Sequence, residues 1–251
     1  MKLFFSVPKA VYLFLVLGIC TSAIPQQTSE SIVRGDTYFN LMRYKDAIAW
    51  YNLDSSQAEA QWKIARANVC YGDHAPALEK EAYFRNAVKA AKRCIQLDET
   101  NSNGHTWLAA AWGNTAMYEG SKTKVQLCNQ IKAQLLRAVE LNPKDDVAHS
   151  IFGSFYREVA HISWLEKQLA LTFIGKIPDG TYEQSEKSFH TAILLAPDIM
   201  RHWYELGLLY VYWNKPDLAK ISFSKAKNCP VKVSSDADRL LLIDKQLQSL
   251  K

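Results

Sequence analysis

The sequence predicts an all-α fold, a solenoid built from helical hairpins, and three observations support this prediction. Glycine and proline are sparse, at 10 and 8 of 251 residues, whereas β folds rich in turns use more of both. Hydrophobic residues make up 48% of the chain, which excludes a disordered protein. Five successive segments repeat apolar residues at three- and four-residue intervals, the spacing that lines one face of a helix.

The clearest of these segments runs from Trp203 to Ala226. It places apolar or small residues at the fourth, seventh, eighth, eleventh, twentieth, twenty-fourth and twenty-seventh positions of a unit, namely Trp203, Leu206, Gly207, Tyr210, Ala219, Phe223 and Ala226. Gly207 and Ala219 are small where two helices would come closest, and residues 214–216 would form the turn between them, because proline suits a helix's first turn. These offsets are those of the tetratricopeptide repeat, a helix–turn–helix unit of about 34 residues.

Two of the other repeats are longer than this unit. Repeat two has 18 positions between Val69 and Ala87 where nine are usual, and repeat three has 17 between Asn114 and Ile131. We expect long second helices in both repeats. In repeat two, the extra residues around 72–84 predict a loop followed by an extended start of the second helix.

Repeat four and the C-terminus carry additions. Repeat four has 29 positions between Tyr156 and Ser185, and its segment 162–175 has the apolar spacing of an inserted helix that ends at Gly175 and Pro178. After repeat five, residues 234–251 predict a capping helix that shields the last open face of the array. Its expected apolar face consists of Leu240, Leu241, Leu247 and Leu250.

The N-terminus has the composition of a leader. Lysines stand at positions 2 and 9, an apolar run covers Val11–Ile19, and the small residues 21–23 follow, which is typical of a signal peptide. We therefore predict a signal peptide over residues 1–23 and a tetratricopeptide-repeat domain over residues 28–251, with about five repeats and a cap. The expected location is secreted or periplasmic. The alternative is a retained leader that anchors the chain to a membrane.

Motifs that carry chemistry are absent from the sequence. None of the 6 histidines stands in a metal-binding pair, and there is no phosphate-binding glycine loop or nucleophile elbow. We therefore expect no enzyme activity, no metal and no cofactor. The net charge of +5, without a dense basic run, does not favour nucleic acid. The spacing of Cys70, Cys94, Cys128 and Cys229 favours free, packed thiols over a disulfide framework.

A binding groove is the better supported site. In such arrays the first helices line a concave surface, to which the second, fifth, ninth, twelfth and thirteenth repeat positions contribute. Arg201 takes such a position in repeat five. The groove residues we expect to contact a partner are Lys63, Trp112, Arg157, Glu158, Tyr204 and Tyr212. Their aromatic and apolar character suits an extended peptide or a partner helix. The alternative is that the inserted segment of repeat four fills the groove.

The segment from Tyr118 to Pro197 resembles the regulator of microtubule dynamics family of tetratricopeptide proteins. The matching pieces are Tyr118-Glu119-Gly120, Asn142-Pro143-Lys144-Asp145, His149, Gly153, Val159-Ala160, Ser163-Trp164-Leu165-Glu166-Lys167, Phe173-Ile174-Gly175, Pro178 and Thr181-Tyr182-Glu183. The resemblance covers nearly all of the chain after the leader. It implies the repeat fold, and it implies that members associate with microtubules or tether organelles.

Two functions follow from these observations. The leader and the groove together predict an exported, non-enzymatic scaffold that binds a peptide or helix of an unknown protein partner. The family resemblance predicts instead a membrane-tethered adaptor that contacts microtubules or organelles.

Overall fold

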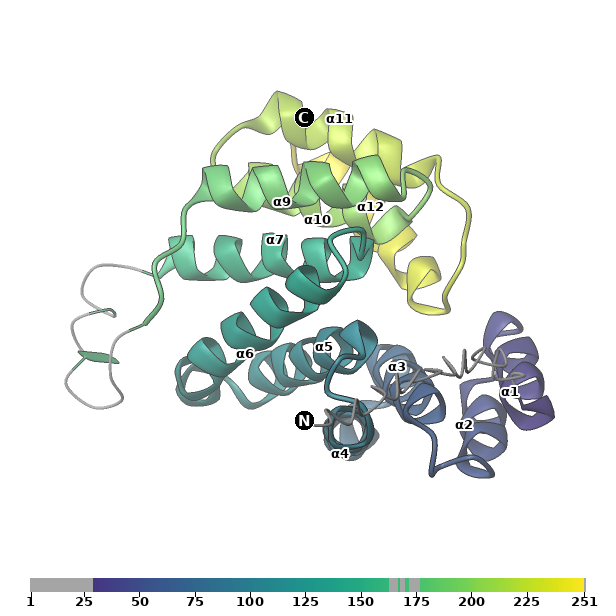
Figure 1. The fold of residues 1–251 in the computed structure, drawn as a ribbon. Coiled ribbons are helices and arrows are strands. Elements are labelled where there is room, and N and C mark those ends of the chain that lie inside the picture. The colour runs from purple at the N-terminus through teal and green to yellow at the C-terminus, as the bar shows by residue number, and fades with distance from the viewer. Residues whose placement is uncertain (1–28, 163–166, 168–169, 172–176, 251) are drawn as a thin grey trace, which may run out of the picture.

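The structure is a computed structural model that describes residues 29–162, 167, 170–171 and 177–250. Figure 1 shows α-helices that follow one another in a curved array. Their bounds are α1 Glu30–Asn40, α2 Tyr44–Asn52, α3 Ala58–His74, α4 Ala77–Leu97, α5 Ser102–Glu119, α6 Ser121–Leu141, α7 Asp146–His161, α9 Tyr182–Leu195, α10 Met200–Tyr212, α11 Pro216–Lys227 and α12 Ser235–Ser249. Consecutive helices pair as hairpins, α1 with α2, α3 with α4, α5 with α6, α7 with α9 and α10 with α11. The predicted all-α hairpin solenoid is confirmed.

The long second helices are confirmed as well. Helices α4 and α6 each have 21 residues, against 12 in α11. The predicted loop in repeat two is wrong, because α3 continues to His74 and α4 already begins at Ala77. The extra residues therefore lengthen both helices of the hairpin and leave only two residues between them.

Local side-chain chemistry explains where several helices begin and turn. The Asp145 carboxylate caps α7 by accepting the backbone N–H of Ala148 at 2.9 Å, and Thr181 and Gln184 form a reciprocal capping box at the start of α9. The turn between α10 and α11 lies at the predicted residues. Asn214 there has a φ of 55°, a left-handed conformation that asparagine tolerates better than most residues.

The two helices of a hairpin meet where an aromatic ring lies against a glycine. The eighth residue of repeats one, four and five is glycine, and the twenty-fourth is aromatic. A Cβ atom built on Gly207 would lie 2.5 Å from Cε1 of Phe223, and one on Gly153 would lie 2.5 Å from Cδ1 of Phe189. Gly35 lies equally close to the ring of Tyr51. Both phenylalanines are fully buried, so the hairpins depend on glycine at these positions.

The described residues form a hydrophobic core with two parts. One cluster runs through α1–α7, and a second joins α9, α10, α11 and α12. Helix α12 closes the second cluster through Ile243, which is fully buried, and the predicted cap is confirmed. Its predicted apolar face is partly wrong: Leu240, Leu247 and Leu250 pack on the cluster, whereas Leu241 is 72% exposed.

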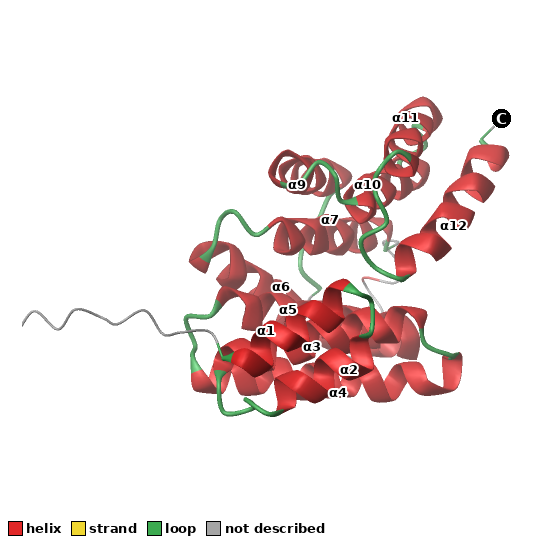
Figure 2. Ribbon diagram, turned by 90° about the vertical axis from the view of Figure 1, so that its right-hand side faces the viewer, coloured by secondary structure: helices red, strands yellow, loops and turns green. Residues whose placement is uncertain are grey.

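Helix α12 also contacts the first part of the array. The backbone N–H of Ser234 donates to the Tyr44 hydroxyl at 3.1 Å, and Asp238 lies 2.8 Å from Nδ1 of His74. Figure 2 shows the N-terminal end of α12 facing the half that contains α1–α6. The capping helix therefore bridges the two ends of the concave side.

The predicted inserted helix of repeat four lies largely outside the described residues, and so does the predicted signal peptide of residues 1–23. Among the described helices, none has the length and apolar character needed to cross a bilayer. Cys70, Cys94, Cys128 and Cys229 are free. Burial raises the pKa of the Cys94 thiol to about 12, which fits the predicted packing role.

We predict that Gly207→Ala lowers the melting temperature, because the added methyl group must displace the Phe223 ring. Such overpacking costs about 1–3 kcal/mol, which exceeds the roughly 1 kcal/mol that alanine gains over glycine within a helix. Gly113→Ala is the matched control, since nothing lies within 4 Å of a Cβ at Gly113, and it should keep or raise the melting temperature. Thermal unfolding followed by circular dichroism measures both. An unchanged melting temperature for Gly207→Ala would contradict the packing argument.

Candidate functional site

The predicted groove residue Arg157 forms an ion pair that joins the two parts of the array. Its Nη1 lies 2.7 Å from Oε2 of Glu205 and 3.3 Å from the Glu205 carbonyl oxygen. Ser154 donates to the same carboxylate at 3.3 Å. The side chains of Arg157 and Glu205 are only 8% and 14% exposed. A pair this deeply buried is stable only if it stays matched and hydrogen-bonded.

The electrostatics of the two groups agree with this pairing. Burial alone would raise the pKa of the Glu205 carboxyl, but the positive charges of Arg157 and Arg201 hold it below its usual value. Burial alone would lower the pKa of Arg157, but Glu205 raises it. Both groups are therefore ionised at neutral pH.

Two more predicted residues lie beside this pair. The Tyr212 ring has its centroid 5.4 Å from the Arg157 guanidinium carbon and meets the His161 ring edge-on at 4.7 Å. Glu158 lies 3.4 Å from Arg157 and 3.5 Å from Nζ of Lys124. Because Tyr212 is still 40% exposed, this junction cluster, which consists of Arg157, Glu158, Tyr212 and Glu205, presents an aromatic ring next to charged groups.

Lys63 and Trp112 lie away from the junction cluster. Lys63 is 7% exposed and its ammonium contacts Asp36 at 2.5 Å and Glu59 at 3.0 Å. Trp112 packs against the first hydrophobic cluster, and Nζ of Lys92 lies 5.5 Å from its ring centroid. Lys63 is therefore occupied by ion pairs within the first two repeats, and Trp112 is partly used in packing.

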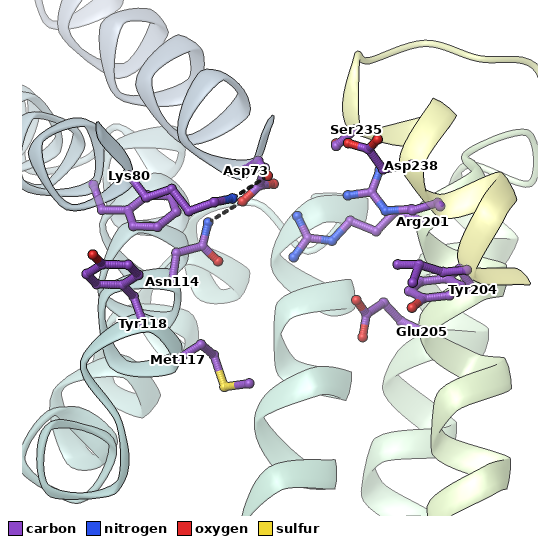
Figure 3. A pocket seen from close by; sticks show the side chains of 13 residues that line it. Asp73, Lys80, Asn114, Met117, Tyr118, Arg201, Tyr204, Glu205, Ser235 and Asp238 are labelled. Carbon is purple, nitrogen blue, oxygen red and sulfur yellow. Dashed lines mark hydrogen bonds between the residues drawn. The ribbon is translucent and has the colours of Figure 1, made fainter. Parts of the chain in front are cut away.

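The described residues line two neighbouring hollows on the concave side. The larger, of about 590 Å³, lies between α5, α6, α7 and α10. The smaller, of about 390 Å³, lies between α3, α4 and α5 on one side and α10 and α12 on the other (Figure 3), and Tyr204 lines it. The residues that line both are Asn114, Met117, Arg201 and Glu205. The two hollows therefore lie side by side, and we refer to them together as the channel; their volumes are in the range of ligand sites.

Several polar residues of the channel were not among the predicted contacts. Glu205 occupies the sixth repeat position, which does not belong to the usual groove set, and Asp73 belongs to the stretched part of repeat two. Asp238 and Arg239 come from the capping helix. The charge of Glu205 within an otherwise apolar helix face was the one signal in the sequence that could have identified it.

Metal ligation has no candidate in the described ranges, where no group of three or more His, Cys, Asp or Glu side chains converges. The buried histidine His202 uses its Nε2 in a 2.8 Å contact with Asp146, and His105 contacts Gln134 at 2.6 Å. These two histidines serve packing and pairing between neighbouring helices.

We predict that Glu205→Gln lowers the free energy of unfolding at pH 7 by about 3 kcal/mol, because the buried Arg157 loses its nearest counter-charge and keeps only the more exposed Glu158, at 3.4 Å. The pKa of Glu205 is lower in the folded chain than the unfolded value of about 4.3. Ionised Glu205 therefore stabilises the fold above that pH, and this contribution is lost as the pH falls through the folded-state pKa. The difference between wild type and variant should shrink below a pH of about 4. Urea unfolding across this pH range measures it.

Glu140→Gln is the control for this experiment. Glu140 forms an ion pair with Arg137 at 3.1 Å, but its side chain is 68% exposed, and such pairs contribute about 0–1 kcal/mol. A loss in Glu205→Gln no larger than that in Glu140→Gln would show that the buried pair does not stabilise the junction.

The fold is shared with a solved structure. A thermophilic TPR protein from Thermus thermophilus superposes with a TM-score of 0.63 over 87% of this chain and 97% of that one, at 18% identity. At such low identity the similarity shows the fold alone.

Curated relatives are more similar in sequence. Regulator of microtubule dynamics protein 1 of Bos taurus is 30% identical over 186 residues, which cover 73% of this chain and 59% of the relative. The protein of that name in Mus musculus is 29% identical over 202 residues, which cover 79% of this chain and 64% of the relative. The matched part of this chain thus spans about three-fifths of the length of these relatives.

These relatives correct the predicted location. The expectation of a secreted or periplasmic protein is wrong, because the relatives are mammalian regulators of microtubule dynamics. Microtubules lie in the interior of eukaryotic cells. A periplasm is a bacterial compartment, and a secreted chain leaves the cell. The run Val11–Ile19, on which both the export prediction and the alternative of a membrane anchor were based, lies outside the described residues.

The family model for regulator of microtubule dynamics protein 1-3 matches residues 36–251. This range contains the five hairpins except for the start of α1, together with the junction cluster, both hollows and the capping helix. The match covers most of the chain, and it agrees with the resemblance that the sequence motifs indicated. The chain therefore belongs to the regulator of microtubule dynamics protein family.

Proposed function

We propose that this protein is a non-enzymatic scaffold that binds a peptide or helix of a partner protein in the channel on its concave side. The observation that carries the proposal is the channel itself, with its neighbouring hollows of about 390 and 590 Å³. The first helices α3, α5, α7 and α10 line it together with residues of α4, α6 and α12 and with Ala170 and Ile177. Apolar and aromatic grooves of this kind receive extended peptides or amphipathic helices.

The composition of the channel supports a protein partner. Met117 lines both hollows and is 56% exposed, and methionine adapts to irregular apolar surfaces. The polar groups of the junction cluster lie beside it and would orient the bound segment. Interfaces of this type combine an apolar centre with a few polar contacts.

The pair Met117→Lys and Leu78→Lys tests this proposal. Leu78 is 97% exposed and lines neither hollow, so each variant adds the same charge to a different surface. In affinity capture from extracts of cells that express the chain, a specific partner should bind wild type and Leu78→Lys and be lost with Met117→Lys. Retention of every partner by Met117→Lys would contradict binding in the channel. Equal melting temperatures of the two variants would show that the loss is local.

Contact with microtubules is the second candidate, and membership of the family favours it, since the relatives are named as regulators of microtubule dynamics. We predict that the chain co-sediments with microtubules polymerised from purified tubulin, with a pelleted fraction that rises with the polymer concentration. The Met117→Lys variant in the same assay tells whether the contact uses the channel. A chain that stays in the supernatant at every polymer concentration would exclude direct contact.

A further inference from the structure

The smaller hollow is lined by charged side chains. Residues of α3, α4 and α5 face residues of α10 and α12 across it, and its volume of about 390 Å³ accommodates one or two amino-acid side chains. Figure 3 shows the side chains of Arg201 and Glu205 directed from α10 toward Asp73 on the opposite wall. The contacts of each charged group decide which of them is available to a ligand.

Most of these groups have a partner within the chain. Glu205 pairs with Arg157 at 2.7 Å, and Asp238 lies 2.8 Å from His74. Arg239 pairs with Asp236 at 2.5 Å, and the Asp73 carboxylate accepts from the amide of Asn114 at 2.8 Å. Nζ of Lys80 donates to the carbonyl oxygens of Gly72 and Asp73, at 3.1 and 2.7 Å.

Arg201 differs from them. Its side chain is partly buried, and it makes no hydrogen bond or ion pair with any residue in the described ranges. A guanidinium group has five N–H donors in a planar fork that matches a carboxylate. Because the N–H groups of Arg201 are unpaired in a partly buried hollow, they can bind an acceptor that arrives with a ligand.

The neighbours of Arg201 limit the charge of that ligand. Asp73, Glu205 and Asp238 also line the hollow, so a doubly charged anion would meet repulsion from three acidic groups. Burial raises the pKa of the Asp73 carboxyl, against the opposing charges of Arg201 and Arg239. A single carboxylate satisfies Arg201, and the carboxylate oxygens around it can accept the N–H groups of a peptide backbone.

We propose that Arg201 binds a carboxylate of the partner segment, carried by an acidic side chain or by a C-terminus. This inference rests on the proposed function, and it adds the chemical group that the channel selects. Charge-assisted, bidentate contacts of arginine with carboxylate are about twice as strong as neutral hydrogen bonds, so an acidic residue should dominate the preference of the channel.

The test uses short fluorescein-labelled peptide pools that carry one fixed Glu or one fixed Gln, with the other positions randomised over uncharged residues. Each pool is made with a free and with an amidated C-terminus. If a side chain is the ligand, wild type should bind the amidated Glu pool about tenfold more tightly than the amidated Gln pool. If a C-terminus is the ligand, wild type should bind the free-acid Gln pool about tenfold more tightly than its amide.

Either preference should disappear in Arg201→Gln and persist in Arg93→Gln, which changes an exposed arginine on α4. Arg201→Lys keeps the charge without the fork and should recover part of the preference. All three variants should keep the wild-type melting temperature. Equal binding of all four pools, no binding, or an undiminished preference in Arg201→Gln would overturn the inference. Pools that bind wild type without any carboxylate preference, and fail to bind Met117→Lys, would overturn it while leaving the proposed function standing.

Discussion

The contact between an aromatic ring and a glycine fixes the distance between the two helices of a hairpin. In repeats one, four and five the ring of the second helix occupies the space where a Cβ of the first helix would lie. The backbone of the first helix therefore contacts the ring directly. This spacing decides how far α7 and α10, the first helices of repeats four and five, project toward the concave side. The wall of the channel that these two helices form therefore depends on close packing on their opposite side.

The junction between repeats four and five depends on polar contacts between α7 and α10. Arg157 pairs with Glu205, and Nε2 of His202 lies 2.8 Å from the Asp146 carboxylate. Polar contacts of this kind contribute less free energy of folding than apolar burial does, but they form in a single geometry. The orientation of repeat five relative to repeat four, and with it the width of the channel, is set by charged groups that themselves line the channel.

The sequence predicted those features that depend on short-range spacing. Gly207 and Phe223 stand at fixed offsets, so the hairpin could be predicted from one segment, and the long helices followed from the residue counts between offsets. Features that depend on the arrangement of the repeats relative to one another could not be predicted. Lys63 has the position of a groove residue, but Asp36 of the preceding repeat binds its ammonium. Leu241 and Ile243 are both apolar, and only the packing of α12 on α10 and α11 decides which one is buried.

The smaller hollow shows most clearly what the sequence alone could not predict. Its walls come from repeat two, repeat three, repeat five and the capping helix, and no spacing rule within one repeat relates these segments. The capping helix brings Asp238 and Arg239 opposite Asp73 because it bridges the concave side to Tyr44 and His74. A cap that only shielded the last hairpin would leave Arg201 facing open solvent, where a guanidinium binds water. The bridge converts an exposed arginine into one that is partly desolvated, and this change in environment gives Arg201 the capacity to select a ligand.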